Sequence, residues 1–561
     1  MNKNLGLSLG ALGLLCCSAC SDDAPACGEP AVFAADALDL EWKWTAGEVA
    51  AIPLVADVDD DGVPDIIINL TRVAADDLAL GEVAVLDSLT GALKWRIAHD
   101  PANQRFGSHG RSTLAVADVD GDGVPDIIYP GRVSDPDGHR SPIHAVDGRG
   151  KLLWTSHHAD GTPAHVTVEI GAAAVANLDA DPGAEVVFGA AILDHDGLLV
   201  WDQSDDGGLF GTPTDNKPQA LPLYRGGLST LVDLDADGKP EVLSGRDAWK
   251  LAWTPGATPG APPSVSLTNL WHDTSGKGND GWPAVADLDN NGTPEVVLVG
   301  WPEIRVLDGR TGELWCGADP SGALCQGDPS RATQPIAITG SNLGGPATLA
   351  DFDGDGAIEA AITGGVALAL YDFNRPDETI VTAATTPAPA PGAIFVRWSL
   401  PIQDQSSAAN GSAAFDFDFD GIPELLHQDE CHFRVLAGDT GLVLGELQNS
   451  SLTGHEYPVV ADIDADGQTE ILVVANQAES FTNDACKAKY PDFTPRQGVH
   501  AYGPGDQQWA SARPFWPQYN HHTTDLDASG RVPQAESPHF ADPATNGFRQ
   551  VSVDPDAGAC K

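Results

Sequence analysis

The chain has 561 residues, of which 30 are Lys or Arg and 81 are Asp or Glu, so its formal net charge is −51. This excess of carboxylates excludes binding to nucleic acid through its phosphates and electrostatic attraction to an anionic membrane, because both need a basic surface. With 42% hydrophobic residues and 14 Trp the chain can form a large core, and its length predicts several domains or one repeat architecture.

The N-terminal residues have the pattern of an export signal. Residues 5–15 form an apolar run that is too short to cross a bilayer but has the length of a signal-peptide core. Small residues precede Cys20, as in bacterial lipoproteins whose cysteine becomes the acylated N-terminus; an ordinary cleaved signal peptide is the alternative. We expect a signal peptide over residues 1–20 and a tether over 21–38. The protein would be exported and held at the outer membrane or cell surface by a lipid on Cys20, its only contact with the membrane, or else secreted.

Export permits disulfide bonds, and six cysteines follow Cys20. Six cysteines allow fifteen pairings, so the sequence leaves the connectivity open. None of their spacings is typical of a zinc site. The pairings that we favour are Cys316 with Cys325, Cys431 with Cys486, and Cys27 with Cys560.

An acidic motif of nine residues recurs eight times, each time between two short apolar stretches. The first copy reads DVDDDGVPD and the last DIDADGQTE. Eight copies at near-regular spacing are not a chance pattern and predict a structural repeat. The copies begin at Asp57, Asp118, Asn177, Asp233, Asp287, Asp351, Asp416 and Asp462.

The spacing within the motif is suited to one hard cation. Side-chain oxygens at positions 1, 3 and 5, a turn-forming Gly near position 6 and a carboxylate at position 9 can surround Ca²⁺, with water and a backbone carbonyl completing six or seven ligands. The last acid of an EF-hand lies at position 12 between two helices, whereas here the flanking stretches are strand-like. Solvated acidic turns are the alternative, but unneutralised carboxylates this close together would repel one another. The sequence therefore predicts about eight Ca²⁺ ions.

The predicted calcium ligands are Asp57, Asp59, Asp61 and Asp65; Asp118, Asp120, Asp122 and Asp126; Asn177, Asp179, Asp181 and Glu185; Asp233, Asp235, Asp237 and Glu241; Asp287, Asp289, Asn291 and Glu295; Asp351, Asp353, Asp355 and Glu359; Asp416, Asp418, Asp420 and Glu424; and Asp462, Asp464, Asp466 and Glu470.

A short hairpin follows most of the acidic motifs, and its second strand often ends in Trp, as at Trp95. Two hairpins per repeat make four antiparallel strands, which is one blade of a propeller. We predict an all-β fold, a single β-propeller of eight four-stranded blades over residues 39–512 with a calcium loop in each blade; seven blades is the alternative. Residues 395–398 are the expected last strand of the sixth repeat. The strand-like residues 40–44 would complete the last blade and close the ring.

The acidic loops resemble the calcium loops of FG-GAP/VCBS-type repeats, which occur in integrin α-subunit propellers and in secreted bacterial propellers. The resemblance covers roughly residues 40–512 and implies a calcium-binding, integrin-like propeller. Integrin propellers have seven blades, so the number eight comes from the repeats of this sequence. Residues 513–524, RPFWPQYNHHTT, are similar to a tail that follows such propellers. We expect residues 513–561 to pack on the propeller or to close it.

Strand order places the calcium loops and the outer hairpin turns on one face of the ring. The variable segments are therefore expected on the opposite face, where binding loops would lie. Residues before the inner strands would ring the channel there, and they form candidate contacts for a ligand; local turn contacts are the alternative. The variable segments are 99–112, 203–227, 254–282, 316–347, 374–411 and 476–498, and the candidate ligand contacts are Arg111, Arg225, Trp282, His455 and Tyr457.

The sequence contains no nucleophile elbow, phosphate-binding loop, dinucleotide fingerprint or HExxH motif, so no catalytic residue is assigned. The paired histidines at 157–158 and 521–522 are predicted to be exposed loop residues rather than metal ligands, since no third ligand has a defined spacing. We predict a non-catalytic adhesion or ligand-binding scaffold for a protein or glycan. A polysaccharide-active enzyme is the alternative, since some rhamnogalacturonan lyases resemble this architecture, and a purely structural envelope protein is a third hypothesis.

Overall fold

The computed structural model describes most of the chain beyond the first 32 residues. The described residues are 33, 38–71, 80–132, 140–168, 170–179, 181–189, 191–202, 228–257, 261–275, 281–316, 336–373, 394–452, 454–477 and 480–553. In these ranges no helix is both long and apolar enough to span a bilayer.

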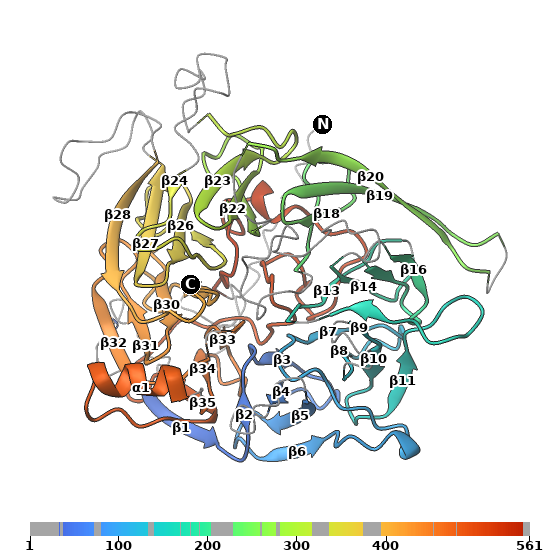
Figure 1. Cartoon of the computed structure of the whole chain (residues 1–561), viewed down its shortest axis with the longest axis horizontal. Coiled ribbons are helices and arrows are strands. Elements are labelled where there is room, and N and C mark those ends of the chain that lie inside the picture. The colour runs from blue at the N-terminus through green and yellow to red at the C-terminus, as the bar shows by residue number, and fades with distance from the viewer. Residues whose placement is uncertain are drawn as a thin grey trace, which may run out of the picture.

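Eight antiparallel sheets stand side by side around a central channel (Figure 1). Each sheet contains the four strands of one propeller blade, and the first carries the additional strand β2 (Glu48–Val49). This confirms the prediction of an all-β propeller with eight blades, and the alternative of seven blades is wrong. In the first seven blades the strands run outward from the channel in chain order.

The first four blades are β3 (Leu54–Ala56), β4 (Asp65–Thr71), β5 (Glu82–Asp87) and β6 (Leu93–Arg96); β7 (Ala115–Ala117), β8 (Asp126–Pro130), β10 (Ile143–Val146) and β11 (Leu152–Thr155); β13 (Ala174–Ala176), β14 (Glu185–Phe188), β15 (Ala191–Leu193) and β16 (Leu199–Asp202); and β17 (Thr230–Val232), β18 (Glu241–Ser244), β19 (Asp247–Thr254) and β20 (Ser264–His272).

The last four blades are β21 (Trp282–Ala286), β22 (Glu295–Val299), β23 (Glu303–Asp308) and β24 (Ile336–Ala337); β25 (Thr348–Ala350), β26 (Glu359–Thr363), β27 (Ala367–Phe373) and β28 (Ile394–Pro401); β29 (Ser412–Phe415), β30 (Glu424–Gln428), β31 (His432–Leu436) and β32 (Val443–Gln448); and β33 (Val459–Ala461), β34 (Glu470–Ala475), β35 (Gly498–Gly503) and β1 (Asp39–Trp44). Outside the blades are the strand pair β9 (Arg140–Ser141) and β12 (Val166–Thr167), the 3₁₀ helices η2 (Pro101–Asn103) and η4 (His539–Ala541), and the helix α1 (Ser480–Lys489).

The two ends of the propeller meet in the eighth blade. Strand β1 pairs antiparallel with β35, with Trp44 opposite Val499, and lies beside it at the rim of the ring (Figure 1). The side chains of Trp42 and Trp44 are buried in the core. Strand β1 is therefore the predicted outer strand that closes the ring, and closure removes the free edges of an open sheet. The predicted last strand of the sixth repeat is confirmed as β28.

The tryptophans that end the outer strands hold neighbouring blades together. The indole nitrogen of Trp95 in the first blade donates to the carbonyl oxygen of Gly148 in the next, at 2.8 Å, and Trp398 donates to Gly438 at 2.7 Å. In the turn that Trp398 covers, Gly441 has a φ of +67°, and a Cβ atom there would lie 2.5 Å from the indole. Trp and Gly therefore recur together because the ring packs directly on a turn that has no side chain.

The C-terminal residues run inside the ring and contact the inner strand of one blade after another (Figure 1). Val55 and Trp516 exchange two backbone hydrogen bonds of 3.0 and 2.9 Å, and Leu349 and Phe548 exchange two of 3.0 and 2.9 Å. The inner strands have an unpaired edge toward the channel, and the tail supplies partners for it. The other contacts with inner strands are Val116 with Pro517, Val175 with Gln518, Thr230 with Asn520, Val285 with His539, and Ala414 with Arg549; in the eighth blade Thr469, which directly precedes β34, contacts Ala510.

Three of the variable segments do not lie wholly where they were expected; one of them, segment 316–347, contains the outer strand β24. Strands β19 and β20 form a long hairpin that extends beyond the ring (Figure 1). Its turn joins the third and fourth strands of the blade, so that part of segment 254–282 lies on the face of the acidic loops, where Pro255 and Asp179 line one cavity. Segment 374–411 likewise contains the connection from β27 to β28, and only its last part links two blades. The prediction was wrong because these outer hairpins are longer than the repeat implied.

Candidate functional site

The eight acidic motifs are the loops between the first and second strands of the blades, and they all lie on one face. In every blade the ninth residue of the motif is the first residue of the second strand. In the sixth loop, Asp351 Oδ2 accepts a hydrogen bond from the amide of Gly356 at 2.8 Å, and Glu359 Oε2 accepts one from Phe352 at 2.8 Å. These bonds fold each loop back on itself and turn its acids toward one point. The ninth residues that accept such a bond are Asp126, Glu185, Glu241, Glu295, Glu359, Glu424 and Glu470.

The third loop differs from the other seven. In the sixth loop, Gly356 has a φ of +88° and a Cβ atom there would touch nothing, so the position needs Gly for its backbone conformation alone. The third loop has Pro182 at this position. Its first residue, Asn177, donates from its amide nitrogen to the carbonyl oxygen of Asp181 at 2.6 Å. That bond keeps the Asn177 oxygen available inside the loop.

Several loop oxygens are buried and have no hydrogen-bond partner among the described residues. Glu185 and Glu359 are both fully buried, and one carboxylate oxygen of each accepts no hydrogen bond from the described residues. A buried acceptor without a donor costs free energy, and a hard cation such as Ca²⁺ would use its lone pairs. The residues present therefore fit a calcium ion. Further oxygens of this kind belong to Asp235, Asp418 and Asp462.

Burial also raises the pKa of the ninth-position acids. Burial, and then the neighbouring loop carboxylates, raise the pKa of Glu185 to about 9, that of Glu424 to about 9 and that of Glu470 to about 10. The negative charge of each acid is unfavourable in its folded environment without a compensating cation. A bound cation would therefore stabilise the ionised form of these acids.

Among the described residues, three loops hold a Lys or Arg side chain, and in the third loop His195 Nδ1 lies 3.3 Å from Asp181 Oδ2. Lys94 Nζ lies 2.6 Å from Asp65 Oδ1 and 3.0 Å from Asp59 Oδ2 in the first loop. Lys250 binds Asp235 and lies 3.0 Å from Asp237 in the fourth. In the sixth loop, the guanidinium of Arg397 binds the carboxylate of Asp353.

Part of the charge around a loop comes from the residue that directly precedes the outer-strand tryptophan. Lys94 precedes Trp95 and Arg397 precedes Trp398. In the eighth blade the corresponding residue is Glu41, whose pKa is raised to about 7 by burial and then by Asp464 and Asp466 of the loop. The sequence prediction missed these residues, although their place beside the tryptophans was a signal that could have found them.

The candidate ligand contacts that the structure describes are buried, and two of them lie against the tail. Arg111, Trp282, His455 and Tyr457 all lie in the interior, and Arg225 lies outside the described residues. The ring of His455 is 4.9 Å from that of Tyr519, and Tyr457 donates to the carbonyl oxygen of Tyr519. The tail thus occupies the part of the channel where a ligand was expected.

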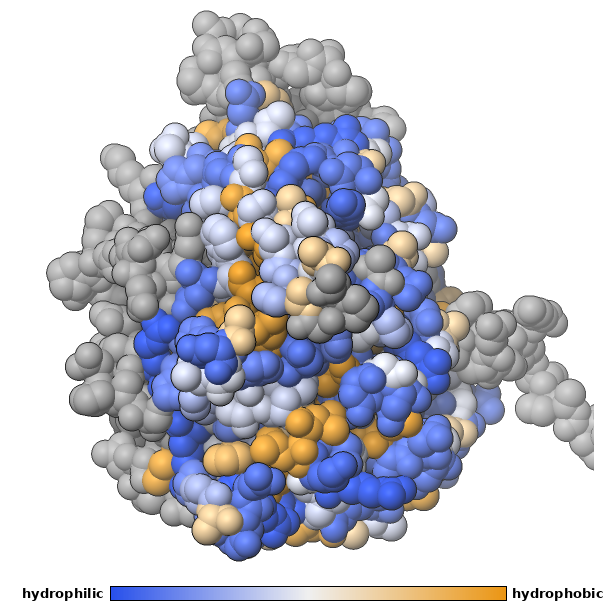
Figure 2. Space-filling model, turned by 90° about the vertical axis from the view of Figure 1, so that its right-hand side faces the viewer, coloured by the Kyte–Doolittle hydropathy of each residue, from blue (hydrophilic) through white to orange (hydrophobic). Residues whose placement is uncertain are grey.

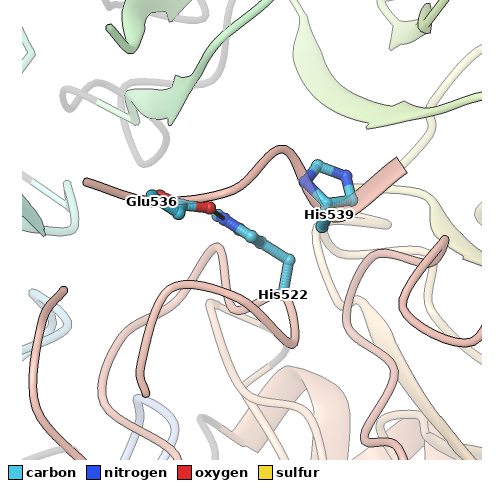
Figure 3. Close-up of side chains that lie close together, drawn as sticks. All are labelled: His522, Glu536 and His539. Carbon is cyan, nitrogen blue, oxygen red and sulfur yellow. Dashed lines mark hydrogen bonds and ion pairs between the residues drawn. The ribbon is translucent and has the colours of Figure 1, made fainter. Parts of the chain in front are cut away.

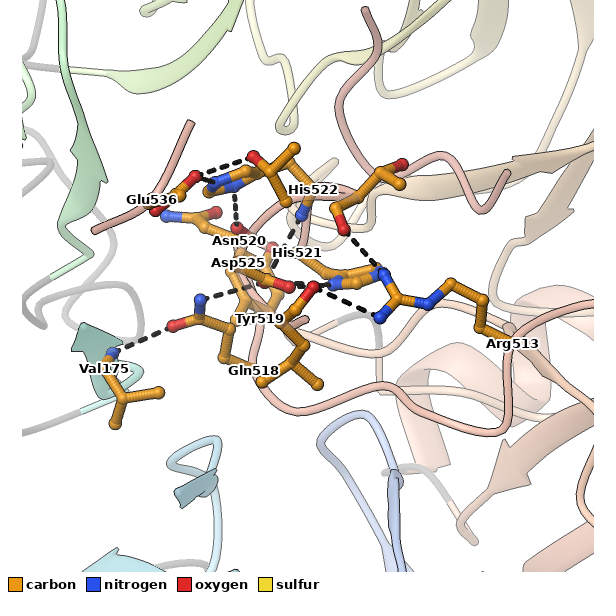
Figure 4. Close-up of polar contacts among 12 residues, drawn as sticks. Val175, Arg513, Gln518, Tyr519, Asn520, His521, His522, Asp525 and Glu536 are labelled. Carbon is orange, nitrogen blue, oxygen red and sulfur yellow. Dashed lines mark hydrogen bonds and ion pairs between the residues drawn. The ribbon is translucent and has the colours of Figure 1, made fainter. Parts of the chain in front are cut away.

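The histidines of the tail are also buried, so the prediction that His521 and His522 are exposed is wrong. His521 Nδ1 lies 3.0 Å from Asp525, and Gln518 joins Asp525 to the backbone of Val175 in the third blade (Figure 4). These polar contacts hold a sharp turn of the tail against the blades. The sequence could not reveal this, because the tail has no strand pattern. Of the other pair, His158 is exposed and His157 is half-buried.

The predicted disulfide bond between Cys431 and Cys486 is confirmed, and it fastens α1 to the seventh blade. Cys20, Cys27, Cys325 and Cys560 lie outside the described residues, so the other two pairings and the acylation site cannot be placed.

No family model and no curated protein matches the chain. Among solved structures, the chain is similar to the V. cholerae biofilm matrix protein Bap1, with a TM-score of 0.62 and 18% identity over 92% of this chain and 99% of that one. It is less similar to the exotype rhamnogalacturonan lyase YesX, with a TM-score of 0.47 and 16% identity over 94% and 84% of the two chains. For a rhamnogalacturonan lyase of Bacillus licheniformis the TM-score is 0.44 and the identity 16%, over 81% of this chain and 71% of that one. The first of these likenesses shows the propeller fold, and at this identity it shows nothing more.

Most of the surface on the side of the ring shown in Figure 2 is hydrophilic, with bands of hydrophobic residues between. Across the described residues only a few large hydrophobic side chains are exposed, and they are scattered, which is normal for a folded protein. They are Leu40, Leu89, Leu93, Val366, Phe419 and Leu442.

Proposed function

We propose that this protein is an exported calcium-binding β-propeller of the FG-GAP/VCBS type and acts as a non-catalytic scaffold that binds a protein or a glycan. The observation that carries the calcium assignment is the set of buried loop oxygens without donors, above all those of Glu185 and Glu359. They belong to loops whose backbone already turns three acids toward one point. Ca²⁺ would satisfy these oxygens and neutralise the repulsion between the acids.

The loops differ in the charge around them, so we infer that they differ in affinity. Ca²⁺ in the first, fourth and sixth loops has to displace Lys94, Lys250 and Arg397 from the carboxylates. The eighth loop has the additional acid Glu41 beside it. About eight ions can bind at saturation, with the eighth loop filled early and the three basic loops filled last.

Export is supported by the disulfide chemistry of the chain. The disulfide bond between Cys431 and Cys486 is of a kind that persists in oxidising compartments outside the cytosol. A lipid on Cys20 would hold the propeller in the cell envelope. A similar fold serves in a protein described as a biofilm matrix component, which is in keeping with an extracellular binding role for this chain.

The partner would bind on the face opposite the calcium loops. Arg111, His455 and Tyr457 are buried, the last two against the tail, so contacts would come from the connections around them. These include the exposed residues of η2 and the link between β34 and β35 that carries α1. Such longer connections on a rigid ring are where binding sites commonly lie.

Calcium titration of the metal-stripped protein tests the first part of the proposal. We expect several equivalents of Ca²⁺ to bind and the melting temperature to fall sharply on chelation, because the ion binds only the folded loops. An EDTA-treated protein with an unchanged melting temperature would contradict the calcium assignment.

A glycan array and a pull-down from envelope proteins, each with and without calcium, test the binding role. We expect specific capture of one ligand class. Incubation with a panel of polysaccharides provides the opposing test, since release of unsaturated oligosaccharides would show a lyase and overturn the non-catalytic assignment.

A further inference from the structure

Three side chains of the tail converge at the inner edge of the fifth blade (Figure 3). His522 Nε2 lies 2.6 Å from Glu536 Oε1, and the rings of His522 and His539 are 4.5 Å apart. One ligand atom from each of the three lies within 4.8 Å of the others. Both histidines are buried, His539 completely. The cluster is distinct from the acidic loops, whose predicted ligands are all carboxylate or amide oxygens.

His539 has a free lone pair inside this cluster. Its Nε2 lies 2.8 Å from the carbonyl oxygen of Val285, an acceptor, so Nε2 carries the proton and Nδ1 does not. Nδ1 is buried and has no hydrogen-bond partner among the described residues. Histidine ligands of metals commonly donate their second nitrogen to a backbone carbonyl in this way. The bare nitrogen needs a donor or a cation.

The other two side chains are fixed by their surroundings. Thr524 Oγ1 donates to Glu536 Oε1 at 2.8 Å. His522 Nδ1 lies 3.4 Å from the carbonyl oxygen of Asn520, and its ring stacks on Phe548 with centroids 5.9 Å apart. These contacts hold Nε2 of His522 and the carboxylate toward a common point, so little has to move for both to bind one ion.

An ion pair between His522 and Glu536 explains only part of this arrangement. Burial lowers the pKa of His522, but Glu536 and Asp525 together raise it to about 9, so the pair can hold a proton. That proton makes a hydrogen bond between His522 and Glu536, which are two of the three side chains. It leaves Nδ1 of His539 buried without a hydrogen-bond partner in the described part of the chain, which is energetically unfavourable.

We propose that His522, Glu536 and His539 bind a divalent transition metal, with Zn²⁺ as the best match to their ligand types. Two imidazoles and one carboxylate form a set that zinc uses with water in the remaining position. Ca²⁺ prefers oxygen ligands, so it would not compete for this site. Glu536 lines a cavity of about 270 Å³ beside the third and fourth loops, which gives ions and water a way in.

The metal would tie together two parts of the tail. His522 belongs to the turn that contacts the third and fourth blades, whereas His539 contacts the fifth. Because the three ligands meet only in the folded tail, binding of the metal would stabilise the tail in the channel. The calcium loops and this site would then act on different parts of the molecule.

The test uses the full chain, stripped of metal and then saturated with Ca²⁺ so that the acidic loops are filled. Titration with Co²⁺, followed by its visible absorption, and with Zn²⁺, followed by calorimetry, should each show one further equivalent. His539→Gln keeps a donor for Val285 but removes Nδ1, and Glu536→Gln removes the carboxylate. Both should lower the affinity at least tenfold. His158→Gln, at an exposed histidine, should leave it unchanged.

Two results would overturn the proposal: no transition metal bound in excess calcium, or equal binding by His539→Gln, Glu536→Gln and the unaltered chain. If the variants do not fold, crystals of the unaltered protein grown with calcium and soaked in Zn²⁺ decide the question. An anomalous peak between the three side chains supports the site. Peaks at the acidic loops alone contradict it. Loss of calcium binding would leave this result unaffected, so the two metal assignments fail separately.

Discussion

Lys94 directs its ammonium group into the first acidic loop, where Nζ lies 2.6 Å from Oδ1 of Asp65. Asp65 is the only ninth-position acid of the eight for which no bond to the amide of the second loop residue is found among the described residues. The lysine thus supplies positive charge at a carboxylate for which the described residues offer no backbone donor of the kind found in the other loops. The residue that precedes the outer-strand tryptophan can therefore determine whether a side chain or a bound cation neutralises the carboxylates of a loop.

Replacing this lysine should create a stronger calcium site. In Lys94→Met the alkyl stem remains but the ammonium is lost, so Asp59 and Asp65 can bind Ca²⁺ without competition. We expect at least a tenfold gain in affinity at one site, measured by competition with a chromophoric chelator. Lys151→Met, at an exposed lysine, is the control. An unchanged count of tight sites in Lys94→Met would show that the first loop does not bind calcium.

Replacing a ninth-position acid should have opposite effects with and without calcium. In Glu424→Gln the side chain can still accept the hydrogen bond from Phe417, which is 3.0 Å long in the native loop, but it carries no charge. Without calcium we expect a gain of about 1–3 kcal/mol in the free energy of unfolding at neutral pH, because the raised pKa of Glu424 makes the folded state hold a proton that the unfolded chain has lost, and Gln avoids the cost of taking it up. With calcium we expect a loss, because one charged ligand is missing. Urea denaturation in EDTA and in excess Ca²⁺ measures both, with the exposed Glu313→Gln as the control. A change of the same sign in both buffers would refute the metal role of Glu424.

The stability of the calcium-free protein should fall as the pH rises. The pKa of Glu185 is raised from its ordinary value of 4.5 to about 9, so the folded state keeps a proton that the unfolded chain has lost between these values. The free energy of unfolding therefore decreases with pH across this window, and Glu424 acts in the same direction. Bound Ca²⁺ should remove most of the decrease, since it stabilises the carboxylates. Melting curves from pH 7 to pH 9, above the range in which buried histidines such as His455 oppose this trend, test the expectation with EDTA and with calcium; parallel profiles would speak against it.

The fold was predictable because its signals are local. An acidic turn with Gly at its sixth position and a tryptophan that covers a glycine turn, such as Trp398 over Gly441, both recur within one repeat. The course of the tail was not predictable in the same way. Val175 meets the side chain of Gln518 from 343 positions away, and most neighbouring contacts use backbone atoms that leave no mark on the sequence.

The same distinction between local and distant contacts applies to the candidate site. The acids of each loop lie within nine consecutive residues of the chain, so the spacing of the predicted ligands could be recognised in the sequence. The basic residues beside them, such as Arg397, reach the loop from the outer strand of the blade, 44 residues from Asp353. His539 and His522 form part of a cluster only because the tail turns twice inside the ring. The spacing of residues in the sequence indicates which side chains of one loop lie close together. The basic residues and the histidine cluster come together only in the closed propeller.

Arg549 should be the residue on which the position of the tail depends most. Its guanidinium is fully buried, donates to the carbonyl oxygen of Ala347 at 2.5 Å and to Asn520 Oδ1 at 2.6 Å, and lies 5.1 Å from the ring centre of Tyr519. In Arg549→Met the volume is nearly kept while both acceptors lose a charged donor, so we expect a loss of about 2–4 kcal/mol in the free energy of unfolding. Urea denaturation in excess calcium measures the loss, and the exposed Arg310→Met is the matched control. Limited proteolysis of the same variant should release C-terminal fragments before the blades are cut, because the tail loses its anchor while the sheets keep theirs. Simultaneous loss of tail and blades would instead mean that the tail is an integral part of the propeller fold.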